Sequence, residues 1–309
     1  ADMILDVVEM PKSIIGFLDK SRVLRKEMEE DDDVELHLDR IFGEIENKTQ
    51  HEFEGYKRNT VLRRIRRRMQ ILQLDSLEHY VERVEQDGEE AQNLFKDLLI
   101  GVTHFFRDKD SFEYLQERII PQLLKNKKED GSTTGLRIWV PGCATGEEAY
   151  TLALIVREEA AKVKMSRPVQ IFATDIDENA LTVARRAVYP EGIEGQMQEK
   201  YLSRYFTKQG NYYQLHKIIR EMCIFSPHNL ISDPPYSRID LIACRNLLIY
   251  FDNHLQRKIL PVFHYSLNPG GFLFLGPSEN ISARPELFRS VSKKHKIFQG
   301  CENVPPAMI

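Results

Sequence analysis

The sequence has few cysteines, and they do not stand in a metal-binding or disulfide spacing. Four of them, at positions 143, 223, 244 and 301, are spread over 309 residues. Cysteine metal sites need closely spaced pairs, and disulfide-rich domains have more cysteines in a shorter chain. We therefore expect no metal ion, no disulfide framework and a location in the reducing cytoplasm.

The sequence also lacks a long apolar run and an excess of positive charge. No segment approaches the ~18 apolar residues of a membrane span, and the amino terminus has no signal-peptide pattern. The 43 Lys and Arg stand against 47 Asp and Glu, for a net charge of −4. A general nucleic-acid binder would carry a basic field. These absences indicate a soluble globular protein that does not bind nucleic acid.

Changes of pattern divide the chain into parts. An acidic run at 27–33 reads as a linker or solvated helix end, and a polar stretch with glycine at 126–135 marks a boundary. Before that boundary the pattern is helical, and beyond it strand and helix patterns alternate. The expected parts are an extension and linker (1–35), a helical domain (36–125), an α/β domain (136–300) with a small β-subdomain at about 190–222, and a tail (301–309).

Residues 136–154 have the pattern strand, glycine loop, helix. Gly142 and Gly146 enclose a tight loop, and Glu147 and Glu148 stand where the helix begins. A glycine loop lets a ligand approach the backbone closely, because no Cβ stands in the way. We expect this loop to bind a nucleotide-type ligand.

The charge at the loop selects among such ligands. The chain has neither a Gly-x-x-x-x-Gly-Lys-Ser/Thr phosphate loop nor the Gly-x-Gly-x-x-Gly of dinucleotide folds. Two glutamates at the helix start would repel a pyrophosphate but suit a cationic amine and sulfonium. We therefore expect S-adenosylmethionine as the cofactor.

A second expected strand, at 169–175, is almost wholly apolar and ends in Asp175. An acid at this place, about 30 residues past a glycine loop, accepts hydrogen bonds from ribose hydroxyls in nucleotide-binding folds. Asp175 could instead cap the following helix, but Asp177 is available for that. We favour ribose binding for Asp175.

The span 56–72 predicts an amphipathic helix with an unusually basic face. Apolar residues at 61, 62, 65, 69 and 72 form one stripe. The rest of the surface carries Arg63, Arg64, Arg66, Arg67 and Arg68. This face is either simply solvated or a docking surface for an acidic partner, and mutual repulsion of the cations favours a counter-charge.

Two further segments allow alternatives. Residues 103–107, Thr-His-Phe-Phe-Arg, read either as a lid with a polar edge or as packing between domains. Asp233-Pro-Pro-Tyr236 is the motif with which amino-methyltransferases hold a planar amine, but there it follows the fourth strand, and here it precedes the strand expected at 239–244. We interpret it as a proline-rich turn.

Six ordered motifs carry a resemblance to a known family. They are Gly-Val-Thr-His-Phe-Phe-Arg at 101–107, Gly-Cys-Ala-Thr-Gly-Glu-Glu-Ala-Tyr at 142–150, Ala-Thr-Asp-Ile-Asp at 173–177, His-Asn-Leu at 228–230, Cys-Arg-Asn-Leu-Leu-Ile-Tyr-Phe-Asp at 244–252 and Leu-Gly-Pro-Ser-Glu at 275–279. Together they resemble the bacterial chemotaxis receptor methyltransferases, the CheR-type family. The resemblance covers roughly residues 36–300. It implies a class I S-adenosylmethionine-dependent methyltransferase domain, with a Rossmann-like doubly wound α/β sheet, an all-helical N-terminal domain and a small inserted β-subdomain. It also implies that glutamate side chains of membrane chemoreceptors are methylated to esters.

The resemblance assigns roles to residues of the matching motifs. The cofactor site would be lined by Thr103, Arg107, Gly142, Gly146, Glu147, Asp175, Asn229, Leu230, Arg245 and Asn246. Arg107 would orient the acceptor carboxylate, and Tyr250 would lie near the transferring methyl group. The arginine helix would dock on the acidic helices of the receptor.

Three features depart from this picture or extend it. Many relatives have Asn where this chain has Gly101, so a cofactor contact is lost or replaced. The expected turn at 209–211 lacks the glycine-rich insertion of relatives that bind a receptor C-terminal pentapeptide, so we expect no such tether. The first ~20 residues faintly resemble the end of a receptor methylesterase, which would fit a fusion of the two enzymes.

Two other functions remain open at this stage. One is a catalytically silent sensor that binds the cofactor, although Glu147, Asp175 and Arg245 show no inactivating substitution. The other is a methyltransferase that acts on a different protein or on a small molecule.

Overall fold

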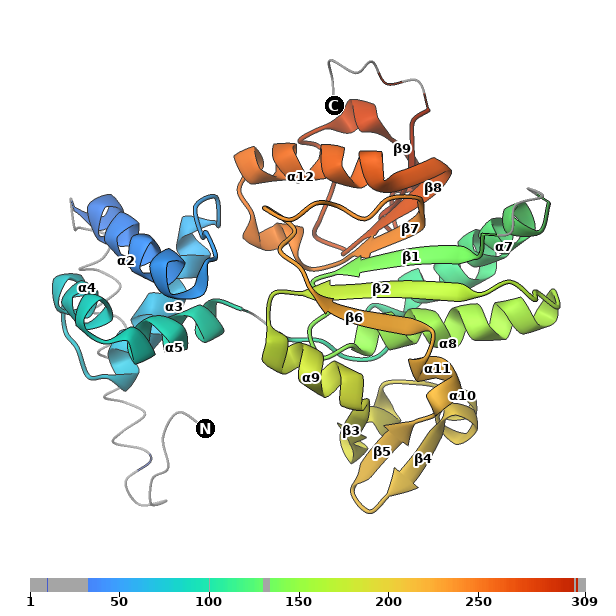
Figure 1. Ribbon diagram of the computed structural model, residues 1–309, viewed down its shortest axis with the longest axis horizontal. Coiled ribbons are helices and arrows are strands. Elements are labelled where there is room, and N and C mark those ends of the chain that lie inside the picture. Colours follow the sequence, from blue (N-terminus) through green and yellow to red (C-terminus); the bar gives the residue numbers. More distant parts are fainter. Residues whose placement is uncertain (1–9, 11–32, 100, 130–133, 303, 305–309) are drawn as a thin grey trace. The chain divides into compact units, whose positions relative to one another are not determined.

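The computed structural model describes residues 10, 33–99, 101–129, 134–302 and 304 (Figure 1). The predicted N-terminal extension, with its resemblance to a methylesterase, lies almost entirely outside these residues. The chain forms two compact units, Ala1–Ile100 and Gly101–Ile309, which are described separately. In the described part of the chain, no helix combines the length and apolarity that crossing a membrane requires.

Between residues 33 and 99 the chain forms four helices: α2 (Val34–Thr49), α3 (Arg58–Ile71), α4 (Leu77–Gln86) and α5 (Gly88–Leu98). Ser76 and Asp87 accept hydrogen bonds from backbone N–H groups at the starts of α4 and α5, as helix-capping residues do. The predicted apolar stripe of α3 is confirmed, because Val61, Ile65 and Met69 are fully buried in the core of this unit.

The larger unit is built on a seven-stranded sheet of order β6-β2-β1-β7-β8-β10-β9. Its strands are β1 (Leu136–Pro141), β2 (Val169–Asp175), β6 (Cys223–Pro227), β7 (Ile239–Cys244), β8 (Leu267–Leu275), β9 (Phe288–Ser292) and β10 (Ile297–Gly300). β6, β2, β1, β7 and β8 are parallel, and β10 is antiparallel to both β8 and β9. This is the predicted doubly wound α/β arrangement.

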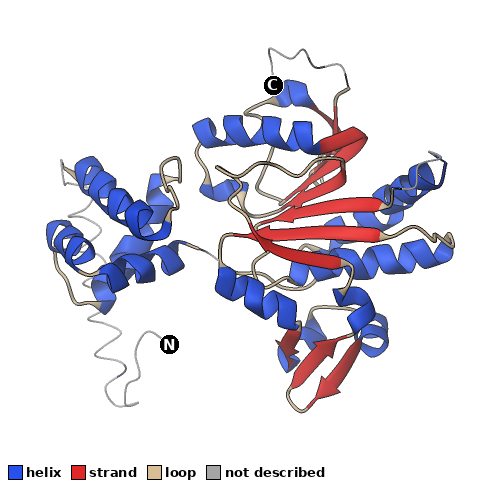
Figure 2. Cartoon of the chain, viewed as in Figure 1, coloured by secondary structure: helices blue, strands red, loops and turns tan. Residues whose placement is uncertain are grey.

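Helices cover both faces of this sheet (Figure 2). Alternate side chains of β1 point to opposite faces. Ile138 and Val140 share a core with α8 (Glu147–Lys162), whereas the Trp139 ring packs against Phe263 of α12 (Asn253–Ser266), 5.8 Å between ring centroids. β7 is buried along its whole length, Asp240 included, as is typical of a central parallel strand.

A small three-stranded sheet of order β3-β5-β4 is inserted between α9 (Glu178–Arg186) and β6. It consists of β3 (Val188–Pro190), β4 (Phe206–Gln209) and β5 (Tyr212–Leu215), with the short helices η2 (Glu191–Gly195), α10 (Glu199–Tyr205) and α11 (Lys217–Arg220) around it. Gln209 pairs with Tyr212, so the turn between β4 and β5 contains only Gly210 and Asn211.

The structure divides the chain earlier than the sequence pattern suggested. The segments α6 (Lys109–Tyr114), η1 (Leu115–Ile119) and α7 (Ile120–Glu129) belong to the larger unit, although the helical domain was expected to reach residue 125. The reason is packing, because Phe112 and Leu115 are buried in the same core as Ile138 of β1.

The last strands also differ from expectation. The apolar run at 272–276 predicts a strand, but β8 already begins at Leu267, because the Asn-Pro-Gly-Gly segment forms an irregularity within the strand, with Gly270 at φ +74°. The sequence pattern also predicts a last strand at 294–299, whereas β10 begins three residues later, and it gives no strand where β9 lies.

Candidate functional site

The predicted site residues of the larger unit gather at one edge of the sheet. Gly142, Asn229 and Arg245 follow β1, β6 and β7, respectively, and Asp175 is the last residue of β2. Glu279, which was not predicted, follows β8. Because these strands are parallel, their carboxyl ends meet at the same edge, which is where open α/β sheets bind ligands.

The loop after β1 has a backbone that requires glycine at both of its ends. Gly142 has φ +70° and Gly146 has φ +92°. A Cβ at Gly146 would lie 2.9 Å from the Cβ of Ala184, and one at Gly142 would lie 3.0 Å from a methyl group of Leu247. The predicted tight loop is therefore fixed by close packing as well as by its backbone angles.

Asp175 ties this loop to the end of β2. Its Oδ2 accepts a hydrogen bond from the Ala144 amide at 2.7 Å, and its Oδ1 accepts one from the Asp177 amide at 2.9 Å. Burial raises the pKa of this carboxyl. Asp177, not Asp175, caps the helix that follows β2. Its side chain accepts hydrogen bonds from the backbone amides of Asn179 and Ala180 at the start of α9. Each Asp175 oxygen can still accept a further hydrogen bond, for example from a ribose hydroxyl.

The two glutamates at the start of α8 have different surroundings. The Glu147 carboxylate accepts a hydrogen bond from Thr145 Oγ1 at 2.7 Å, and burial raises its pKa. Glu148 lies 3.2 Å from Nη1 of Arg245, and burial raises its pKa to about 7 despite this cation. The charge argument against a phosphate ligand therefore depends on Glu147, because the Glu148 charge is paired internally.

The side chain of Arg245 is completely buried and joins three segments. Its guanidinium pairs with Asp108 at 2.7 Å and with Glu148 at 3.2 Å. The guanidinium carbon lies 4.7 Å from the ring centroids of both Phe112 and Phe274. The charged group of Arg245 therefore faces Asp108, Glu148 and two rings, and its predicted contact with the cofactor stays a prediction.

Glu279 holds the loop after β7, and sequence reasoning had given it no role. Its Oε2 accepts from the amides of Gly276 at 2.6 Å and Asn246 at 2.9 Å, and its Oε1 accepts from the amide of Ile249 at 3.3 Å. Asn246 has φ +61°, a left-handed conformation that this carboxylate stabilises. Tyr250 lies half-buried in η3 (Leu248–Tyr250), directly after Ile249. The sequence motif at 275–279 ends in Glu279 and could have indicated that this residue has a role.

The segment that contains Thr103 and Arg107 is strongly bent. Phe106 has φ +50° and Asp108 has φ +60°. The Phe105 amide donates to Gln196 Oε1 at 3.0 Å, and the Phe106 amide donates to Thr151 Oγ1 at 3.1 Å. Thr103 is half-buried, and Arg107 Nη1 donates to the carbonyl of Val102 at 2.9 Å.

Phe105 and Phe106 are not equivalent. Phe105 is fully buried and packs edge-on against the rings of Tyr189 and Phe206. Phe105 therefore packs within the larger unit, whereas the sequence had suggested a lid or contact between domains. Phe106 is only half-buried and its ring faces a cavity.

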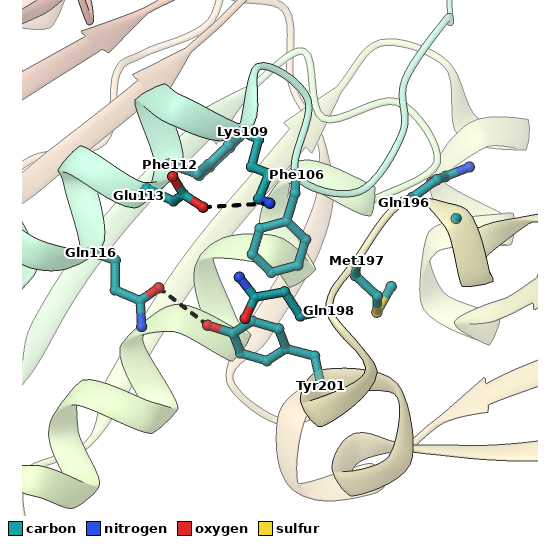
Figure 3. Close-up of a pocket in the computed structure, with 10 residues that line it drawn as sticks. Phe106, Lys109, Phe112, Glu113, Gln116, Gln196, Met197, Gln198 and Tyr201 are labelled. Atoms are coloured by element: carbon teal, nitrogen blue, oxygen red, sulfur yellow. Dashed lines mark hydrogen bonds and ion pairs between the residues drawn. The ribbon is translucent and has the colours of Figure 1, made fainter.

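That cavity has a volume of ≈ 150 Å³ (Figure 3). Its lining residues are Phe106, Lys109, Phe112, Glu113, Gln116, Gly195, Gln196, Met197, Gln198 and Tyr201. Tyr201 donates to Gln116, and Lys109 lies 3.7 Å from Glu113. None of the predicted cofactor residues lines this cavity.

The loop after β6 is stabilised by the proline-rich turn. The Asn229 amide donates to Asp233 Oδ2 at 2.8 Å, and Asn229 Oδ1 accepts from the Ile231 amide at 2.9 Å. Leu230 is largely buried. The Tyr236 ring packs against Trp139, with 5.4 Å between centroids. Asp233 and Tyr236 thus act as parts of a turn before β7, as the sequence interpretation held.

In the helical unit, the arginines of α3 are divided between internal and exposed roles. Arg68 pairs with Glu90, which is only 3% exposed and also accepts a hydrogen bond from Tyr80. Arg67 lies 3.3 Å from Asp97. Arg64 and Arg66 are half-buried, while Arg63 is exposed. Acidic residues of α5 therefore supply part of the counter-charge that the sequence pattern led us to expect from a partner.

The order of the parallel strands, the glycine loop and the acid after β2 define a class I methyltransferase. Residues 101–297 match the S-adenosylmethionine-binding domain of the CheR methyltransferases, and residues 36–99 match their all-alpha domain. The chain therefore belongs to the CheR methyltransferase family, which confirms the predicted resemblance, fold class and cofactor.

Several relatives carry names from chemotaxis. The chain is 32% identical over 76% of its length to chemotaxis protein methyltransferase 2 of Vibrio cholerae, of which it covers 82%. It is 33% identical over 76% of its length to chemotaxis protein methyltransferase 1 of Pseudomonas aeruginosa, of which it covers 86%. A 104.1 kDa protein of Rhodobacter capsulatus is 41% identical over 80% of this chain, which spans only 26% of that relative. These names say that the first two relatives are methyltransferases of chemotaxis proteins.

Proposed function

We propose that this protein transfers the methyl group of S-adenosylmethionine to glutamate side chains of chemoreceptors and so forms glutamate methyl esters. The observation that carries the proposal is the match of 36–99 and 101–297 to the two domains of one methyltransferase family. The chemotaxis names of relatives that the chain covers over most of their length support the acceptor.

The residues at the sheet edge fit the cofactor. Gly142 and Gly146 have positive φ values that favour glycine, so the backbone at both ends of the loop carries no Cβ. Glu147 offers a half-buried carboxylate for the cofactor's amino group, and Asp175 offers one for the ribose hydroxyls. Asn229 and Leu230 would frame the adenine.

Other predicted site residues contribute through position. Thr103 would form part of the wall of the cofactor pocket. Asn246 would contact the cofactor with its backbone and its side chain. The Arg245 guanidinium would support the pocket from beneath, because it links Asp108 to Glu148 inside the protein.

The reaction needs no general base. A glutamate carboxylate has an ordinary pKa of about 4.3 and is ionised at neutral pH. The cofactor supplies an electrophilic methyl group on a sulfonium. When bound, it would give this methyl group to the acceptor oxygen, and the electron pair of the broken sulfur–methyl bond would go to sulfur. Two opposite charges disappear, so a site that excludes water favours the step.

The protein's task is therefore alignment. Arg107, in the middle of the bend at 106–108, would orient the acceptor carboxylate through a charge-assisted hydrogen bond. Tyr250, half-buried after Ile249, would contact the methyl-sulfonium through its ring face or hydroxyl group.

The role of Tyr250 can be tested by replacing it with Phe and with Ala. We expect Tyr250→Ala to lower kcat by about 10- to 100-fold, as loss of one transition-state contact does, with product affinity unchanged. The Tyr250→Phe variant keeps the ring and lacks the hydroxyl group, so it shows which of the two contributes to turnover. Equal turnover of both variants and wild type would remove Tyr250 from the mechanism.

The proposed partner is the cytoplasmic helical part of a chemoreceptor. The exposed arginines of α3, Arg63 in particular, would face its acidic helices. The two-residue turn between β4 and β5 leaves no glycine-rich insertion there, which supports docking without a pentapeptide tether. The relative of which the chain spans 26% supports a place in a longer polypeptide.

One experiment tests the proposal against its competitors. The protein is incubated with methyl-labelled cofactor and receptor cytoplasmic domains, and the label is followed after mild base. Base-labile label on the receptor supports glutamate ester formation. Base-stable label would mean a different acceptor group, and absence of transfer despite cofactor binding would favour a silent sensor.

A further inference from the structure

The turn between β9 and β10 brings a group of lysines to the edge of the sheet where the candidate site lies. β10 is antiparallel to β8 and pairs Ile297 with Phe274. The turn at 293–296 therefore lies beside the carboxyl end of β8, where the amide of Leu275 donates to the carbonyl of Lys296 at 3.0 Å. The loop that contains Glu279 leaves β8 at this same end.

This turn is strongly basic. From residue 287 to 301 the sequence carries Arg289, Lys293, Lys294 and Lys296, and no acidic residue. Lys293 and Lys294 are exposed, and Lys296 is half-buried. Within the described ranges, none of the three lysines forms an ion pair.

The turn is also anchored to the segment that leads into the site. The His295 ring stacks on Tyr114 of α6, with 4.7 Å between centroids and 15° between planes. Two residues earlier in α6, Phe112 packs against the Arg245 guanidinium. The turn is therefore held near the site residues instead of extending freely. The exposed charges of α6 are mixed, since Lys109 pairs with Glu113 and Asp110 lies beside them.

We propose that Lys293, Lys294 and Lys296 form a docking surface, the lysine turn, for the acidic helical protein that presents the acceptor glutamate. The inference rests on the proposed function. A substrate carboxylate must reach the carboxyl edge of the sheet, so the acidic surface around it would meet the lysine turn. We favour a protein over an anionic membrane because the lysines adjoin the reaction site.

The lysine turn lies in the methyltransferase unit, so it would act on binding separately from the arginines of α3. Surface charges of this kind act chiefly on the rate of encounter and on its salt dependence. They leave the chemical step of the bound complex unchanged.

The test replaces two exposed lysines in the complete chain, Lys293→Glu with Lys294→Glu. The matched control is Lys164→Glu with Lys258→Glu, two exposed lysines, of which one follows the far end of α8 and the other lies on α12. KM and kcat for a receptor cytoplasmic domain are measured at low and high salt, and product affinity is measured by calorimetry.

We expect the turn variant to raise the receptor KM about tenfold at low salt, with the difference shrinking at high salt. Its kcat and product affinity should match those of the control. An unchanged KM in a receptor-methylating protein would overturn the inference. Loss of binding to vesicles of anionic lipid, with receptor KM unchanged, would overturn it in favour of a membrane surface. Failure of the wild-type chain to methylate the receptor would instead reject the proposed function.

Discussion

At the scale of single residues, the site is supported by buried charges that sequence motifs could not place. Arg245 is in a recognisable motif, but its guanidinium lies between two phenylalanine rings and pairs with Asp108 and Glu148. Removing one partner of such a group leaves an uncompensated buried charge, which is costly. Arg245 and its partners therefore fix the positions of the bend at 106–108 and the start of α8.

The unusual environment of Glu148 predicts a pH-dependent stability. Its carboxyl titrates near 4.5 in the unfolded chain and at about 7 in the folded protein, chiefly because it is buried. Folding thus favours the protonated form. The stabilisation from this group is fully present below pH 4.5 and is lost as the pH rises through about 7.

Glu148→Gln removes this titration. Between pH 4 and 8, the unfolding free energy of wild type should fall relative to the variant by about 3 kcal/mol, since a pKa difference of one corresponds to about 1.4 kcal/mol. Urea unfolding of both proteins at several pH values measures this, and other carboxyls cancel in the difference. Parallel pH profiles would show that Glu148 titrates normally.

The glycine loop gives a second prediction at this scale. Gly146→Ala should destabilise the protein by about 1–3 kcal/mol and weaken product binding, because φ +92° and the neighbouring Ala184 disfavour a Cβ. Gly101→Ala is the matched control, since a Cβ there meets nothing within 4 Å. Thermal unfolding and product affinity are the measurements. Equal effects of the two substitutions would contradict the packing argument.

Short-range features of the site could be predicted from the sequence, and long-range ones could not. The glycine spacing of the loop and the capping role of Asp177 are local features, so local pattern revealed them. The packing of the loop against Ala184 and Leu247 is not local and was not predicted. Glu279 and Asn246 are 33 positions apart, and Arg245 and Asp108 are 137 apart. Such pairs depend on the order of strands in the sheet, which local periodicity does not contain.

At the scale of elements, helix α3 shows how one pattern can combine two roles. Its apolar stripe and basic face were both evident in the sequence. The ion pair of Arg68 with Glu90 was not, because the acid lies on α5. Arg63 is exposed, whereas Arg68 pairs with the buried Glu90. Substitutions of these two arginines should therefore have different effects on stability.

Arg68→Met should destabilise the helical unit by about 3–5 kcal/mol, because Glu90 would be left buried without its cation. Arg63→Met, the matched control, should change stability by no more than about 0.5 kcal/mol, because the side chain is exposed. The control should instead lower kcat/KM for the receptor. Chemical unfolding and methylation assays of both variants separate these outcomes. A large stability loss in Arg63→Met would mean that its side chain is structural.

Element boundaries were predictable where a strand is largely apolar in sequence. β2 and β7 have the expected bounds, because most of their residues are apolar. β7 is fully buried, whereas Gln170 of β2 is exposed. β9, with exposed Arg289, Ser290 and Val291, has no apolar run and was missed. α6 and α7 were assigned to the wrong side of the boundary, because a helical pattern does not reveal which core its apolar face joins.

At the scale of the whole chain, the two units have separate apolar cores. One core includes Ile41 and Ile65, and the other is formed around Ile138 and Leu152. A unit with its own core is expected to unfold as its own cooperative transition. All predicted cofactor residues belong to the larger unit.

Product binding should therefore stabilise only one of two thermal transitions. At a concentration of 100 times Kd, S-adenosylhomocysteine should add about 2.7 kcal/mol to the larger unit. For about 200 residues, this corresponds to a rise of roughly 5–10 °C in Tm. The Arg68→Met variant identifies the transition of the helical unit, because this substitution should lower the Tm of that transition alone. Calorimetry with and without product provides the measurement. If both transitions rose together, the units would be energetically coupled, and cofactor occupancy could then change the stability of the helices proposed to meet the receptor.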